Sequence, residues 1–133
     1  MGKKLNYQRT LSEALGNLTW NTKYFVVHHI NHNRNDNNIY NLVLIPKKLH
    51  KKYHLLVSLA SSYCEDILKK DVTCIPVSHL NAISKLIDCK NDIAIVHQAQ
   101  VYAINSIKRF GYNEEIMDLY YANIREIAIK YGC

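Results

Sequence analysis

The stretch VVHHINHNRNDNNIYNLVLIPKKLHKKYH, from Val26 to His54, decides the fold of this chain and holds five of its seven histidines. Its opening run is apolar, rich in β-branched residues, and ends in two adjacent histidines, which is typical of a strand. Residues 31–38 are almost all Asn and Asp, which bond their own backbone and tolerate left-handed angles, so they predict a loop. Residues 41–45 are a second apolar run, and Pro46 ends that strand because it has no N–H to donate.

A helix is predicted from Lys47, where the apolar residues begin to recur every three or four positions. A shorter helix is predicted over residues 7–16, with Gly16 at its end. The remainder of the chain has helical periodicity, with Asn91 and Asn113 expected as N-caps. The predicted C-terminal helices cover residues 78–88, 91–111 and 113–132.

These elements predict an α+β protein. Its core is a two-stranded hairpin plus a helix, with a short N-terminal helix in front and an all-helical C-terminal extension behind. With 133 residues, 48% of them hydrophobic, the chain can bury a core of its own. We expect the core domain to cover residues 1–70 and the extension residues 71–133, with the boundary between Lys70 and Pro76.

The basic charge of the chain is concentrated at its front. The net charge is +6, and residues 1–54 alone carry nine Lys or Arg against two acids. A polyanion should therefore meet the histidine-rich part. The sequence lacks a signal-peptide pattern, an apolar run long enough for a membrane span and any CxxC pair, so we expect an intracellular protein with reduced thiols and no membrane association.

The spacing of the histidines favours a metal site. His50 and His54 lie four apart on the predicted helix, so both imidazoles share one face and can bind one ion. The end of the preceding strand can supply a third ligand. His28 and His29 should project to opposite sides of that strand, leaving one ring free to take a proton near neutral pH. The alternative is that His50 and His54 are solvated side chains, and the ordered strand, loop, strand and HxxxH combination argues against it.

The motifs HHINHNRNDNNIYNL and HKKYH resemble those of the HNH endonucleases, which are ββα-metal nucleases. The upstream segment YQRTLSEALGNLTWNTKYFVVHHI resembles the helix and LG turn of phage-type members. The resemblance covers about residues 7–54, and the rest of the chain resembles no family. It implies that the hairpin and helix form a ββα-metal nuclease core.

The resemblance also implies roles for individual residues. His28 matches the first metal-ligand position, and His29 matches the general base. Asn41 matches the central asparagine, which in the family bonds the loop backbone and so fixes the orientation of the base. His50 and His54 match the helix positions that complete the metal site.

The loop of this chain both follows the family pattern and departs from it. Asp36 and Asn37 match the DN pair of the family's loop, and Asn33 matches an asparagine earlier in that loop. The family often has Gly where His32 stands and an acid where Tyr40 stands. Either the loop backbone differs here or His32 reaches phosphate; the predicted catalytic set is not affected.

The expected function is therefore a metal-dependent DNA endonuclease that nicks or cuts duplex DNA by hydrolysing phosphodiester bonds. The resemblance implies one divalent metal ion, with Mg, Mn, Zn and Ni all able to occupy such a site. Basic side chains of the loop and helix should contact DNA phosphates. These residues are Arg34, Lys47, Lys48, Lys51 and Lys52. The alternative for each lysine is that it is simply a solvated side chain, and the sequence does not favour one over the other.

Two other functions stay open from the sequence. The first is a non-catalytic DNA-binding or assembly module that keeps the ββα-metal fold, and the second is a structural zinc protein. The amphipathic C-terminal helices are expected to form either a helical cap or a homodimer interface. The residue bias suits an AT-rich phage or mobile element as the source.

Overall fold

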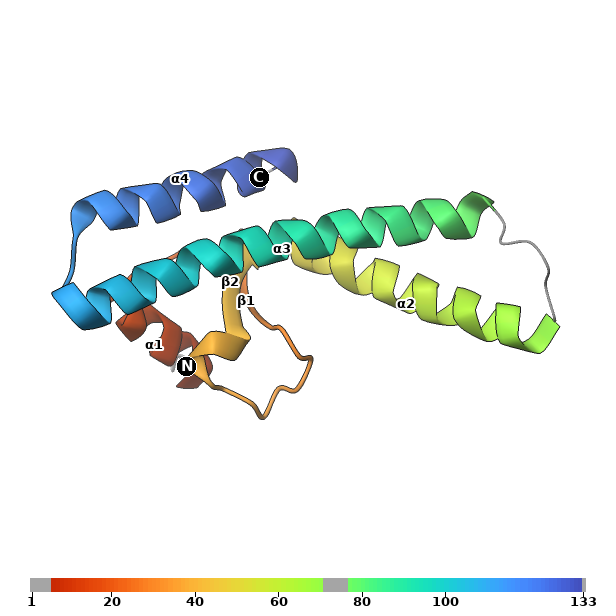
Figure 1. Cartoon of the computed structure of the whole chain (residues 1–133), viewed down its shortest axis with the longest axis horizontal. Coiled ribbons are helices and arrows are strands. Elements are labelled where there is room, and N and C mark those ends of the chain that lie inside the picture. The colour runs from red at the N-terminus through yellow and green to blue at the C-terminus, as the bar shows by residue number, and fades with distance from the viewer. Residues whose placement is uncertain (1–5, 71–76, 133) are drawn as a thin grey trace.

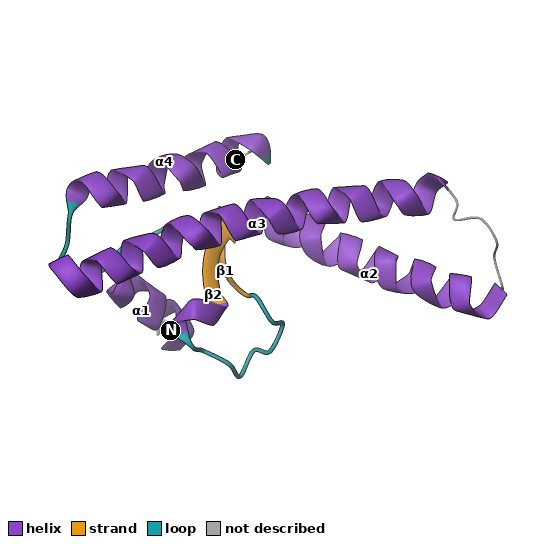
Figure 2. Cartoon of the chain, in the orientation of Figure 1, coloured by secondary structure: helices purple, strands orange, loops and turns teal. Residues whose placement is uncertain are grey.

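The computed structural model describes residues 6–70 and 77–132; for residues 6, 63–70 and 77–79 it describes the backbone alone. The elements, shown in Figure 2, are α1 (Asn6–Ala14), β1 (Phe25–His29), the 3-10 turn η1 (Ile39–Asn41), β2 (Leu42–Pro46), α2 (Lys47–Lys70), α3 (Val77–Phe110) and α4 (Glu114–Lys130). The predicted α+β class is confirmed, with a short N-terminal helix, an antiparallel hairpin followed by a helix, and a helical C-terminal region.

The long helix α3 is the element against which the rest of the molecule packs (Figure 1). Helix α2 runs beside its N-terminal half, α4 runs beside its C-terminal half, and the hairpin meets it near the middle. None of the helices among the described residues has an apolar stretch long enough to cross a lipid bilayer. The hairpin therefore meets α3 between the part that packs on α2 and the part that packs on α4 (Figure 1).

Strand β2 is buried along its whole length, and α3 completes its hydrogen bonding. Its inner edge pairs with β1, with Val27 opposite Leu44. On its outer edge the Leu44 N–H donates to Gln100 Oε1 at 3.0 Å, and Gln100 Nε2 donates to the Leu42 carbonyl at 2.6 Å. Gln100 is fully buried. One amide side chain of α3 thus takes the place of a third strand, so the polar backbone can lie in the core.

One continuous hydrophobic core joins the hairpin to the helices. The predicted apolar face of α2 is confirmed where its side chains are described, because Leu49, Tyr53 and Leu56 are all buried. The same cluster contains Leu11 of α1 and Ile104 of α3. The boundary predicted after residue 70 stays a prediction; most of that stretch lies outside the described residues, and the core draws on both sides of it.

The prediction of two helices over residues 78–88 and 91–111 is wrong, since α3 runs unbroken from Val77 to Phe110. No Gly or Pro interrupts this span, so the local preference of Asn91 for a cap is overridden by packing. The neighbouring Asp92 is buried, accepts a hydrogen bond from the Tyr131 hydroxyl and pairs with Lys130 at 2.9 Å. These bonds tie the end of α4 to the middle of α3.

The predicted helix ends are otherwise confirmed. The Asn113 side chain accepts from the Glu115 N–H at 2.8 Å and caps α4, with acids in the first turn where the helix dipole favours them. Gly16 follows α1 with a φ of +73°. A Cβ there would lie 2.6 Å from the Tyr112 ring, so glycine is needed both for the turn and for the contact with the chain before α4.

Candidate functional site

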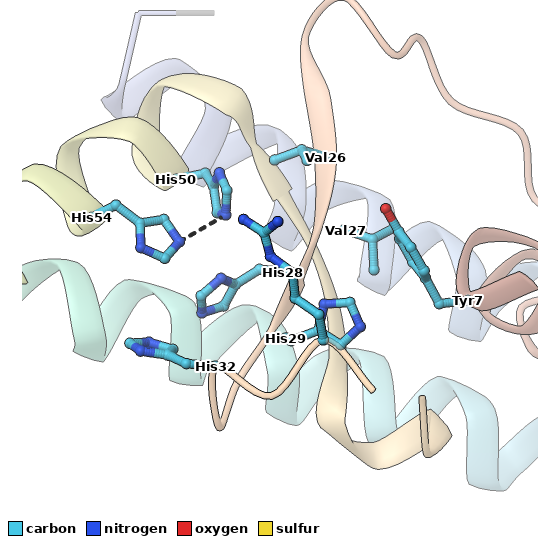
Figure 3. Close-up of a pocket in the computed structure, with 9 residues that line it drawn as sticks. Tyr7, Val26, Val27, His28, His29, His32, His50 and His54 are labelled. Atoms are coloured by element: carbon cyan, nitrogen blue, oxygen red, sulfur yellow. Dashed lines mark hydrogen bonds between the residues drawn. The ribbon is translucent and has the colours of Figure 1, made fainter. Parts of the chain in front are cut away.

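Three histidines from two elements converge beside the hairpin. His28 is on β1 and buried, whereas His50 and His54 are one turn apart at the start of α2. Because β2 runs directly into α2, the first turns of that helix lie against the end of β1. One ligand-capable nitrogen from each of the three rings lies within 4.8 Å of the other two. Figure 3 shows the three side chains together, with His50 and His54 joined at 3.0 Å between their Nε2 atoms.

Burial and mutual repulsion keep these imidazoles neutral. Desolvation, followed by the neighbouring rings of His50 and His54, lowers the pKa of His28 to about 3. Desolvation, then His54 and Arg34, lowers the pKa of His50 to about 4. The pKa of His54 is lowered as well, first by desolvation. At neutral pH each ring therefore has a nitrogen lone pair free to coordinate.

The donor set fits a divalent transition metal. Three neutral imidazoles leave coordination positions open, as catalytic sites do, and favour Zn, Ni or Mn over Ca. The cluster also opens to solvent, since all three rings line a pocket of about 480 Å³. The same pocket is also lined by Tyr7, Val26, Val27, His29, His32 and Arg34.

His29 points to the other face of β1, as the alternation of a strand requires, yet lines the same pocket. Its Nε2 lies 2.9 Å from Asn37 Oδ1, and its ring meets the Tyr7 ring edge-on at 5.0 Å between centroids. An amide oxygen can only accept, so Nε2 carries the proton. The lone pair is therefore on Nδ1, and that nitrogen is the one able to take a proton.

Asn41 ties the two ends of the Asn-rich loop together. Its Nδ2 donates to the Asp36 carbonyl at 2.8 Å and to Asn31 Oδ1 at 3.0 Å, while its Oδ1 accepts from the Asn31 N–H at 3.0 Å. The loop is stiffened further by side chains that accept from the backbone N–H two residues on. These side chains belong to Asn31, Asn33, Asp36 and Asn38.

Of the basic residues, Arg34 lies closest to the histidines. It lines the pocket, and its charge contributes to the lowered pKa values of His50 and His54. Asp36, its nearest acid in the sequence, bonds Asn31 and the Asn38 backbone, and the two described side chains form no ion pair with each other. The guanidinium is therefore not neutralised by that carboxylate.

The four lysines at the start of α2 divide into two groups. Lys48 Nζ donates to the Gly132 carbonyl at 2.8 Å, and Lys52 Nζ lies 5.5 Å from the centroid of the Tyr131 ring. These two lysines contact the end of α4. The other two are exposed, without such a contact. The contact with DNA phosphates expected for these four lysines stays a prediction, and the sequence did not show that two of them lie against the end of α4.

Sequence reasoning also missed the contacts between Tyr40 and α3. The His97 side chain donates from Nε2 to the Tyr40 carbonyl at 2.8 Å. The Tyr40 hydroxyl donates to Asn105 Oδ1 at 2.9 Å, and Lys108 lies over the ring. Tyr40 directly precedes Asn41, so α3 holds the base of the loop. The unusual tyrosine at this position was the available signal.

Comparison with known families gives one match. The model of a family described as HNH endonuclease matches residues 14–52, which include His28, His29, Asn41 and His50 and end two residues before His54. Searches of curated proteins and of solved structures found no match. The resemblance of this chain to the HNH endonuclease family is thereby confirmed over residues 14–52.

Proposed function

We propose that this protein is a metal-dependent endonuclease that hydrolyses DNA phosphodiester bonds. One observation supports this most: three neutral imidazoles converge within 4.8 Å, and a fourth, free to act as a base, lines the same pocket. The segment that supplies most of these residues is matched by the HNH endonuclease family, which makes a nuclease-type, DNA-binding function the expected one.

His28, His50 and His54 would hold one divalent cation. When bound, the cation offsets negative charge that develops on the phosphate and on the leaving oxygen. Imidazole ligands favour binding of Zn, Ni or Mn, and Mg is the remaining candidate for turnover. Burial of His28 supports the site. Its neutral ring is shielded from water, and a bound cation would give its unprotonated nitrogen a partner.

His29 would serve as the general base. The bond to Asn37 leaves Nδ1 unprotonated, and that nitrogen accepts a proton from the attacking water. Asn41 acts one step further away, by holding the loop that carries Asn37. Arg34 is the basic residue best placed to bind a phosphate beside the site, and its contact with the backbone would carry no base specificity.

Plasmid cleavage tests the proposal. With Mn²⁺ or Mg²⁺ the protein should nick or linearise supercoiled DNA, and EDTA should abolish the reaction. His29→Ala should slow cleavage about 100-fold or more, while Mn²⁺ affinity measured by calorimetry stays within about twofold of wild type. Tyr102→Ala, on an exposed part of α3, is the control and should cleave normally.

Three outcomes would contradict this assignment. Cleavage that persists in His29→Ala would show that His29 is not the general base. Duplex binding without any cleavage would favour the non-catalytic DNA-binding module. Folding that requires metal, again without cleavage, would indicate a structural zinc protein. Homodimerisation through the C-terminal helices, an intracellular location and a phage or mobile-element source stay predictions.

A further inference from the structure

His32 has a backbone conformation that is uncommon for any residue other than glycine. Its φ is +63°, in the left-handed region, where a Cβ is less favourably placed than in the right-handed one. Among the described residues other than glycine, only Asn17 shares this sign. Strain of this kind persists where the side chain has a role, so its surroundings point to that role.

The His32 side chain stands beside the imidazole cluster without being part of it. Its ring centroid lies 5.5 Å from that of His54 and 5.7 Å from that of His28 (Figure 3). It lines the same pocket. Yet the group of nitrogens close enough to share one ion, within the described residues, contains only the other three histidines. His32 therefore faces the space next to the cation site.

Tyr53 fixes the direction of the His32 ring. Its hydroxyl lies 3.0 Å from His32 Nε2, while its own ring is buried in the core at 6% exposure and packs edge-on against His28. The phenol of Tyr53 carries its proton at neutral pH, so its hydroxyl can donate that proton to Nε2. When it donates to Nε2, the ring proton of His32 must sit on Nδ1, which becomes a hydrogen-bond donor.

We propose that His32 is a substrate-binding residue whose Nδ1–H donates to a non-bridging oxygen of the scissile phosphodiester, and that Tyr53 is its positioning residue. This rests on the proposed nuclease function. A phosphate oxygen accepts but never donates, so it matches the donor that the Tyr53 bond creates. With Arg34 on the same pocket, the phosphate would meet donors from the loop and the cation from the other side.

The binding test uses the full chain in a His29→Ala background, so that duplex DNA is not consumed. In Mn²⁺, adding His32→Gly should weaken anisotropy-measured binding of a short fluorescent DNA duplex about 10-fold, the usual range for one hydrogen bond to a charged group. Mn²⁺ affinity should stay within about twofold, and the melting temperature should not fall, because glycine relieves the backbone strain. Asn35→Gly is the matched control: an exposed residue of the same loop that does not line the pocket.

A second measurement tests Tyr53. Nitrogen NMR of the wild-type imidazoles should show the His32 proton on Nδ1, and Tyr53→Phe should move it to Nε2 and weaken duplex binding about threefold. A merely structural role for Tyr53 would leave the tautomer unchanged. A His32 proton on Nε2 in the wild type would overturn the assignment.

The remaining outcomes separate this proposal from the nuclease function. A loss of Mn²⁺ affinity of tenfold or more in His32→Gly would make His32 a fourth metal ligand and overturn the phosphate contact. Equal loss of duplex binding in Asn35→Gly would assign the effect to loop flexibility. If the wild type cleaves DNA and His32→Gly binds the duplex as well as its parent does, only the proposed phosphate contact is refuted. If duplex binding depends on His32 but the wild type never cleaves, only the nuclease function is refuted.

Discussion

The two halves of the molecule are stabilised in different ways. Residues 25–54 combine an apolar hairpin with an exposed loop that is held by side-chain bonds to its own backbone. Helices α3 and α4 instead bury apolar side chains and offer few polar ones to the interior. The histidines of the candidate site thus lie on a short strand and on the first turns of a helix that border this loop, and the helices that pack against the hairpin come from elsewhere in the sequence.

A few polar side chains connect the two halves. Gln100 bonds the outer edge of β2, His97 bonds the carbonyl of Tyr40, and Lys48 reaches the carbonyl of Gly132. Each connects positions more than fifty residues apart in the chain. If the helical half supports the site, breaking these bonds should have graded effects on the hairpin and the loop.

The largest effect is expected at Gln100. Gln100→Leu keeps the volume but leaves the Leu44 N–H and the Leu42 carbonyl unpaired in the core, so the free energy of unfolding should fall by about 3 kcal/mol. Urea unfolding followed by circular dichroism measures it. Gln98→Leu, exposed on the same helix, should change stability by less than about 0.5 kcal/mol. Equal stability of the two variants would mean that α3 does not support β2.

A second test uses acid on the chelator-treated protein. The folded-state pKa values of His28, about 3, and His50, about 4, lie below the unfolded value of 6.5. Between these values the unfolded chain binds more protons, so stability is complete above pH 6.5, falls as the pH drops, and levels off below the folded-state values. The slope should reach at most about 1.4 kcal/mol per pH unit for each histidine, with less from the half-buried His50.

Denaturant unfolding at several pH values measures this slope. His28→Leu removes the more buried of the two groups, so its curve should be shallower over the same window. A wild-type curve that is flat between pH 6.5 and 4 would mean that the cluster is open to water without its metal. The histidine half would then be far looser than the helical half.

The smallest effect is expected at Tyr40. Tyr40→Phe removes the bond to Asn105 but keeps the carbonyl that His97 contacts, so stability should fall by less than about 1 kcal/mol. Amide hydrogen exchange in residues 31–38 should nevertheless speed up severalfold, because the base of the loop loses one anchor. Tyr24→Phe, another exposed tyrosine, is the control. Unchanged exchange in the loop would show that its own Asx bonds suffice.

How much of this could be predicted depends on how local each feature is. The hairpin, the start of α2 and the Asn113 cap follow from residue spacing within a few positions, and the HxxxH spacing after a strand ending in HH explains why the three rings meet. The roles of these histidines stay predictions.

The remaining features depend on tertiary contacts. The unbroken α3 and the Gln100 bridge depend on which helix packs on β2, and the bond from Lys48 to Gly132 depends on where α4 ends. The role proposed for His32 starts from its own backbone φ, which the spacing of residues in the sequence does not predict.

The Gln100 bridge has a consequence for anyone who would graft this hairpin onto another protein. Without α3, the outer edge of β2 would leave the Leu42 carbonyl and the Leu44 N–H unpaired and its apolar side chains exposed. A strand from a second molecule could then pair with that edge. A graft that ends before Gln100 should therefore self-associate, whereas one that carries α3 brings its own cover for that border.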